Sequence, residues 1–142
     1  MKKIFYLLSA STILLGSCQQ QATKEAVKHQ QLAEEAIMVH DEIMPQIAHF
    51  DKTTVKIDSI LENLGQVLIK DPKADTATIR IDLITLKSNL EAATENMMTW
   101  MKEYNPDSTA VTYQEAEIQK IKAMKKQFED VSLESNKKLG KL

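Results

Sequence analysis

Four side chains with soft donor atoms could bind a metal ion. His40 and Met44 are four residues apart in the chain. Met97 and Met101 repeat that spacing farther along. On a helix this spacing places both members of a pair on one face. An imidazole with thioethers is a donor set that suits Cu(I). Methionine also fills gaps in helical cores, so we expect core packing without a cofactor. A copper site at these four residues is the alternative.

Other reactive combinations are less well supported. Asp41 and Glu42 could act as acid and base, but adjacent carboxylates are more often part of a solvated face. A zinc site from His40, Asp41 and His49 is disfavoured, because residues 40 and 49 lie about two and a half turns apart. The sequence has no glycine-rich phosphate loop, no HExxH motif and no serine or cysteine placed with a base as a nucleophile. We therefore expect a protein that is not an enzyme.

Cys18 is the residue with the clearest predicted chemistry. The chain begins with Lys2 and Lys3, continues with an apolar run over residues 4–15, and reaches Leu15-Gly16-Ser17-Cys18. This order is typical of a signal peptide over residues 1–17, and the apolar run is shorter than the ~20 residues of a spanning helix. The quartet resembles the bacterial lipobox. This resemblance implies that Cys18 carries acyl chains such as palmitate and becomes the first residue after the signal peptide is removed. The acyl chains would anchor the protein to a membrane.

The residues after Cys18 bear on which membrane carries the anchor. Residue 19 is Gln rather than Asp, and residues 19–23 contain no acidic cluster. By resemblance to the sorting rule of enteric bacteria, this favours the outer membrane with the body facing the periplasm. Retention in the inner membrane and exposure at the cell surface remain alternatives.

The composition indicates one all-helical domain. Without its first 17 residues the chain has 125 residues, and loss of Lys2 and Lys3 changes its net charge from -2 to about -4. Gly and Pro are scarce, with three of each, and helix-forming residue types dominate. There is no basic face with interleaved aromatic residues, so we expect no nucleic-acid partner.

Two polar segments divide the chain into three predicted helices. They are residues 70–75 and 104–108, and each combines proline with Asp or Asn. The helix over 76–104 carries apolar residues at alternating spacings of four and three, as in a heptad repeat. These residues are Ile79, Leu83, Leu86, Leu90, Ala93, Met97, Trp100 and Tyr104. Similar patterns cover 36–68 and 118–131.

Short connections make consecutive helices antiparallel neighbours. We therefore predict an up-down-up antiparallel three-helix bundle with a long first helix. Pro45 should kink that helix, and the alternative is a four-helix fold with the first helix split near 49–51. Residues 36–142 would form the bundle domain. Residues 18–35 would form a polar linker, or helical stalk, between the lipid and the bundle.

One end of the predicted bundle collects chemically distinctive residues. Pairing the first helix with the second across residues 70–76 places residue 40 opposite about 106 and residue 44 opposite about 102. That end then contains Met38, His40, Met44, Met97, Met98, Trp100, Met101, Tyr104 and Tyr113. The combination is similar to periplasmic copper and silver carriers in which an indole face caps the ion. The bundle's other end contains mostly Leu, Ile and Val.

Two short motifs carry a resemblance to a family. The segment His40-Asp41-Glu42-Ile43-Met44-Pro45 and the later pair Trp100-Met101 resemble a pattern in small helical lipoproteins of Bacteroidota. Some of these carry the name "viral A-type inclusion protein". The resemblance implies a helical lipoprotein and no known activity. We expect a membrane-tethered, non-enzymatic binding or structural component of the cell envelope, with another envelope protein as partner.

Overall fold

The computed structural model describes residues 16–140 and 142, which form four helices and no strand. The helices are α1 (Gly16–Glu62), α2 (Leu64–Lys70), α3 (Thr76–Glu103) and α4 (Val111–Leu139). The predicted all-α class is therefore confirmed for this part of the chain. Of the predicted signal peptide over 1–17, residues 1–15 lie outside the described part of the chain, and the last two begin α1. Cys18 is described only as backbone in the first turns of α1.

The helix boundaries follow from local side-chain chemistry. Asp75 caps α3, since its Oδ1 accepts hydrogen bonds from the backbone N–H of Ala77 at 3.0 Å and of Thr78 at 3.2 Å. These N–H groups would otherwise have no partner in the first turn of the helix. At the end of α1, the side-chain amide of Asn63 donates to the Ser59 carbonyl at 2.9 Å. Such a side-chain bond competes with the helical backbone, and Asn63 leaves the helical conformation with φ -117° and ψ 29°.

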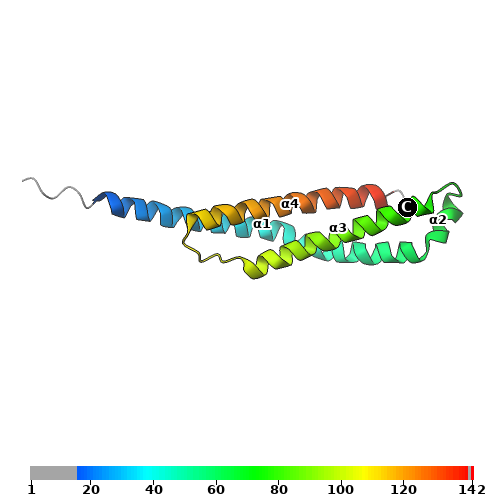
Figure 1. The fold of residues 1–142 in the computed structure, drawn as a ribbon, viewed down its shortest axis with the longest axis horizontal. Coiled ribbons are helices and arrows are strands. Elements are labelled where there is room, and N and C mark those ends of the chain that lie inside the picture. Colours follow the sequence, from blue (N-terminus) through cyan, green and yellow to red (C-terminus); the bar gives the residue numbers. More distant parts are fainter. Residues whose placement is uncertain (1–15, 141) are drawn as a thin grey trace, which may run out of the picture.

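The three long helices form one elongated body in which each contacts the other two. Figure 1 shows α1 and α4 running in the same direction, with α3 returning in the opposite direction. Ion pairs match positions along α1 with positions along α4. Between α1 and α4, Lys28 bonds to Glu115 and Lys125 bonds to Glu42, each at 2.6 Å. Each exposed pair stabilises the fold by at most about 1 kcal/mol, so these pairs select the register more than they provide stability.

The predicted apolar seams form the core. On α3, every seam position from Leu83 to Trp100 is buried. The apolar residues of the pattern over 118–131, now in α4, are buried as well, namely Ile118, Ile121, Met124, Phe128 and Val131. Phe50 and Phe128 stack at the centre, with ring centroids 4.9 Å apart. This geometry is the offset stacking that aromatic pairs prefer. The heptad spacing therefore predicted which faces of the helices lie inside.

The first helix differs from the prediction in where it is interrupted. The alternative split near 49–51 is not present, and Pro45 does not interrupt the helix, because α1 continues through Pro45 to Glu62. The interruption comes instead at Asn63, and residues 64–70 form the short helix α2. Pro45 is exposed, so its ring faces solvent, and the lost hydrogen bond is that of the Asp41 carbonyl.

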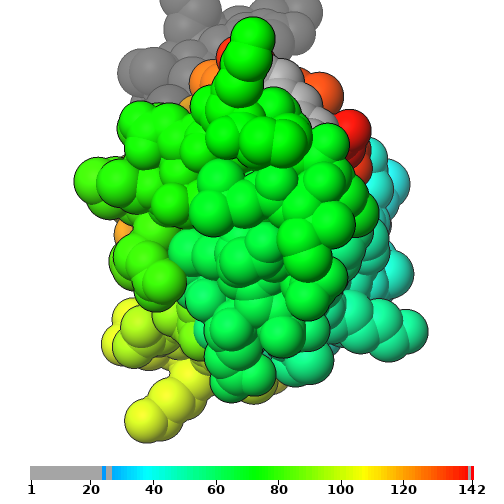
Figure 2. All heavy atoms as spheres, turned by 90° about the vertical axis from the view of Figure 1, so that its right-hand side faces the viewer, coloured from blue at the N-terminus to red at the C-terminus, as the bar shows by residue number. Residues whose placement is uncertain are grey.

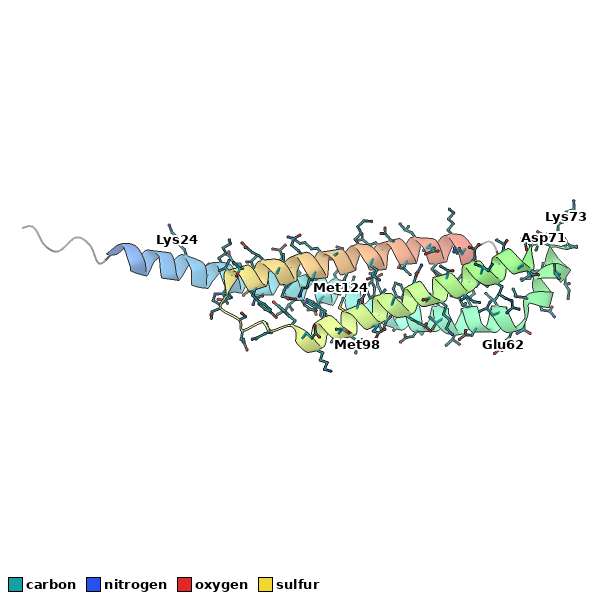
Figure 3. The ribbon with its side chains drawn as sticks, in the orientation of Figure 1. Lys24, Glu62, Asp71, Lys73, Met98 and Met124 are labelled. Atoms are coloured by element: carbon teal, nitrogen blue, oxygen red, sulfur yellow. The ribbon has the colours of Figure 1, made fainter. Side chains whose placement is uncertain are left out.

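Packing also begins earlier on α1 than the expected boundary at residue 36. Ala33 is buried, and Lys28 and Glu35 form ion pairs with Glu115 and Lys122 of α4. The expected stalk over 18–35 is therefore not a free helix throughout, since its second half lies against α4. Figure 3 shows Lys24 on the part of α1 that extends past the start of α4. Within the described range, no helix is both long and apolar enough to span a membrane.

Candidate functional site

Four aromatic rings stack in a column at the end of the body where α4 begins. The Trp100 and Tyr104 centroids are 4.4 Å apart and nearly parallel. His40 lies 5.8 Å from Trp100, and Tyr113 lies 6.4 Å from Tyr104. We call these four residues the aromatic column. The sequence predicted that they would gather at one end, although it placed His40 opposite residue 106 rather than opposite Trp100.

A buried carboxylate holds the column against α4. The Trp100 Nε1–H donates to Glu117 Oε2 at 2.9 Å, and Lys120 Nζ donates to Glu117 Oε1 at 2.7 Å. The Glu117 side chain is only 7% exposed, so both of its oxygens have the partners that a buried charge requires. The hydrogen bond to Glu117 raises the pKa of Lys120, so the Lys120 ammonium group is charged at neutral pH.

Gln114 ties the connection between α3 and α4 to the same end. Its buried amide Nε2 lies within hydrogen-bond distance of the carbonyls of Asn105 at 3.2 Å, Pro106 at 3.2 Å and Ser108 at 3.0 Å. Its Oε1 accepts from the Tyr104 hydroxyl at 2.9 Å. Burial raises the pKa of Tyr104, and the nearby Tyr113 and Glu117 add to that shift, so the hydroxyl stays protonated as a donor.

The methionines of this end do not share one environment. Met97 is fully buried in the core and Met44 is half-buried against it. Met101 is 41% exposed and Met98 is 51% exposed, and Figure 3 shows Met98 on the outer edge of α3. The four residues of the predicted copper alternative, His40, Met44, Met97 and Met101, therefore range from fully buried to exposed. Among the described residues, no group of three or more His, Cys, Asp or Glu side chains could hold a metal ion.

His40 is the one member of the column with an unused polar atom. Its Nδ1 lies 2.9 Å from Asp41 Oδ1. Its Nε2 is buried and has no hydrogen-bond partner within the described part of the chain. A buried polar atom without a partner is uncommon, so this nitrogen is the place in the column where a ligand or water could bind.

The remaining charged candidates have structural partners. Asp41 bonds to His40, and Glu42 bonds to Lys125, so the two carboxylates face different groups and do not form an acid–base pair. Four lysines of α4, all between residues 120 and 126, also bond to carboxylates. Their contacts are Lys120 with Glu117, Lys122 with Glu35, Lys125 with Glu42 and Lys126 with Asp130.

The sequence did not point to Gln114 or Glu117 as buried residues. Gln114 precedes Ile118 by four residues, so it continues the seam spacing of α4, but its polar type hides it from a search for apolar repeats. Glu117 follows Gln114 by three residues and precedes Ile121 by four, so the spacing also puts it on the buried face of α4, but a charged residue is not expected there. Comparisons with protein-family models, with curated proteins and with solved structures found no match to this chain.

Proposed function

We propose that this protein is a lipid-tethered, non-enzymatic component of the bacterial envelope that acts as a rigid spacer. Cys18 would carry the lipid, and the body would be a three-helix bundle with α2 across its far end. The observation that carries the proposal is the continuity of α1, which includes the backbone of Cys18 and runs without interruption to Glu62. A tether at Cys18 would therefore hold the body through a helix and not through a flexible linker.

The length of α1 sets the distance that such a spacer would cover. From residue 18 to residue 62 a helix rises about 65 Å at 1.5 Å per residue. Packing against α3 and α4 supports α1 from Ala33 onward, and the α1–α4 ion pairs begin at Lys28. We propose that the body faces the periplasm from the outer membrane and presents its far end to another envelope protein, with helix-on-helix packing as the mode of contact.

The spacer function predicts a large difference in height between the two ends of the body above the membrane. The lipidated protein would be placed in a supported bilayer that contains an acceptor dye, and a donor dye would be attached to Lys24→Cys or to Lys73→Cys. Figure 3 shows these positions at opposite ends of the body. Since Cys18 is the only natural cysteine and its sulfur would carry the lipid, the introduced thiol is the only one available to the dye.

The expected result is strong energy transfer from position 24 and weak transfer from position 73. Equal transfer from both positions would mean that the body lies flat on the bilayer, and would overturn the spacer function. Labelling at Lys52→Cys, an exposed site between the two, should give an intermediate transfer. Energy transfer that does not decrease in the order of positions 24, 52 and 73 would also count against the proposal.

A second candidate function is Cu(I) binding at the aromatic column. The observation that favours it is His40 Nε2, which is buried without a hydrogen-bond partner in the described part of the chain, with its ring stacked on Trp100. Titration of the mature chain, residues 18–142 with Cys18→Ser, against a competing Cu(I) chelator would test it. Binding that is tighter than micromolar and lost in His40→Ala would support it. Binding unchanged in a Met44→Leu, Met101→Leu double variant would exclude the predicted ligand set.

A further inference from the structure

The far end of the body contains a pocket of about 650 Å³ between α2, α3 and the end of α4. Figure 2 looks onto this end, where residues of α2 and the start of α3, in green, cover most of the surface. The volume lies within the roughly 300–1,000 Å³ that is typical of small-molecule sites. The pocket is at the opposite end from the aromatic column and shares no residue with it.

One wall of the pocket is apolar. It is lined by Val67 of α2 together with Ile79 and Leu83 of α3. Leu83 is almost fully buried, while Val67 and Ile79 are half-buried. These side chains come from two helices, and the packing of α2 on α3 brings them together. An apolar ligand would remove the exposed apolar surface of Val67 and Ile79 from water, which is favourable in proportion to the area covered.

The acidic groups at the rim of the pocket already have donors. Glu134 accepts from Lys138 at 2.8 Å and from Asn89 at 3.2 Å, and Asp82 also binds Lys138. The hydrogen bond from Lys138 lowers the pKa of Glu134. Burial lowers the pKa of Lys138, but its bonds to Glu134 and Asp82 outweigh this and raise it overall. This group of charges is therefore satisfied within the protein.

Two lysines at the rim are available to an anion. Lys137 is exposed, and no hydrogen bond or ion pair of its side chain is found within the described residues. Lys70 donates only to the main-chain oxygen of Leu142, at 3.1 Å. The ammonium group of Lys70 has three donors, so it could bind an anionic group beside the Leu142 oxygen. The pocket thus combines an apolar wall with two lysines that pair with no Asp or Glu side chain of the described residues.

We propose that this pocket binds a single-chain amphiphile with an anionic head, such as a fatty acid. The apolar chain lies against Val67, Ile79 and Leu83, and the head group binds between Lys70 and Lys137. The lysine ammonium groups act as charge-assisted donors to the head group. This inference does not depend on the spacer function, because it concerns the pocket alone.

The test uses the mature chain, residues 18–142 with Cys18→Ser, so that neither lipid nor detergent competes for the pocket. The buried core begins at Ala33, so this chain retains all of it. Binding of cis-parinaric acid, a fluorescent fatty acid, is followed by its emission, and dodecanoate and dodecanol are used as competitors. We expect one-to-one saturable binding, with dodecanoate displacing the probe at about tenfold lower concentration than dodecanol because only dodecanoate has a charged head.

Two variants assign the binding to this pocket. Ile79→Trp fills the apolar wall and should abolish binding. Lys70→Glu with Lys137→Glu should weaken dodecanoate binding about tenfold or more and leave dodecanol binding unchanged. The matched control is Lys52→Glu with Lys56→Glu, which changes the net charge equally at exposed positions of α1 and should bind like the parent.

Three outcomes would overturn the proposal. These are the absence of saturable binding, binding that survives both the Ile79→Trp and the lysine variants, and equal loss in the control variant. A further experiment uses vesicles of anionic phospholipid, because the same head-group chemistry could come from a bilayer. Binding to vesicles without binding of monomeric fatty acid would also contradict the proposal, since it would locate the interaction on the protein surface.

Discussion

The indole N–H of Trp100 donates a hydrogen bond of 2.9 Å to the buried carboxylate of Glu117, and this bond joins the end of α3 to the start of α4. The carboxylate is completed by Lys120 on its other oxygen. The rings of His40 and Tyr104 both stack on Trp100, with centroids 5.8 Å and 4.4 Å from that of the indole. The most distinctive residues of the chain therefore form a structural joint at the end of the body near Cys18.

The first prediction concerns that joint. Trp100→Ala should lower the free energy of unfolding by about 3–5 kcal/mol, since it removes a large buried side chain. Trp100→Phe should cost less, about 1–3 kcal/mol, because it leaves one Glu117 oxygen without its donor. Urea unfolding followed by circular dichroism measures both values. Met98→Ala, at an exposed position of the same helix, should change stability by less than about 0.5 kcal/mol. A Trp100→Ala effect as small as this control would contradict the burial of the indole.

The second prediction concerns the connection between α3 and α4. Gln114→Leu keeps a side chain of similar size but removes the amide that contacts three carbonyls. We expect a loss of about 2 kcal/mol or more, because buried polar groups lose their partners. Amide hydrogen exchange should also become faster in residues 104–110 than in the rest of the body. Uniformly faster exchange along the whole chain would instead indicate a global effect and no specific role in this connection.

The third prediction is a pH dependence that arises from Glu134. Its pKa in the folded protein is lowered from the ordinary value of 4.5, mainly by the hydrogen bond from Lys138. The stabilisation is therefore complete above the unfolded-state pKa and is lost as the pH falls through the lower folded-state pKa. Glu134→Gln should be less stable than the parent at neutral pH, by at most about 1 kcal/mol because the pair is partly exposed. The difference in stability between the parent and Glu134→Gln should become smaller below pH 4.5.

Stability measured between pH 3 and pH 7 checks this dependence. Glu95→Gln, an exposed position on α3, serves as the control for loss of a carboxylate. If the parent and Glu134→Gln differ in their free energy of unfolding by the same amount at every pH, the difference comes from packing and not from the titration of Glu134.

The fourth prediction concerns Pro45. This residue lies inside α1 without ending it, so the Asp41 carbonyl lacks its usual N–H partner. Pro45→Ala restores the donor and should raise the free energy of unfolding by up to about 3 kcal/mol. Pro72→Ala, in the turn between α2 and α3, lies outside the helices and should not stabilise the fold. A less stable Pro45→Ala variant would show that the body is fitted to a bend that only proline produces.

The interior of the long helices was predictable from the sequence because burial there follows a single rule. On α3, the spacing of four and three residues puts the positions from Leu83 to Trp100 on one face, and all of them are buried. Polar residues on the same face were harder to identify. Gln114 and Ser135 continue the seam of α4 in both directions and are buried, but an apolar pattern ends where the residue type changes.

Two other features depend on contacts that spacing does not encode. The apolar pattern continues from Leu61 to Leu64, so periodicity gives no sign of the break at Asn63, which follows from one local side-chain bond. The pocket at the far end exists because α2 packs back on α3 after that break. Its lining comes from residues far apart in the sequence, such as Val67 and Glu134. No local pattern could have predicted it.

We propose that Cys18 is the lipid attachment point from which α1 extends as a spacer. The most direct test is the intact mass of the protein purified from the membranes of a bacterial host. We predict a chain that begins at Cys18 and carries the added mass of a diacylglyceryl group, with or without a further acyl chain. The Cys18→Ala variant should lack that mass and leave the membrane fraction or retain residues 1–17. A membrane-bound protein whose Cys18 is unmodified would contradict the account.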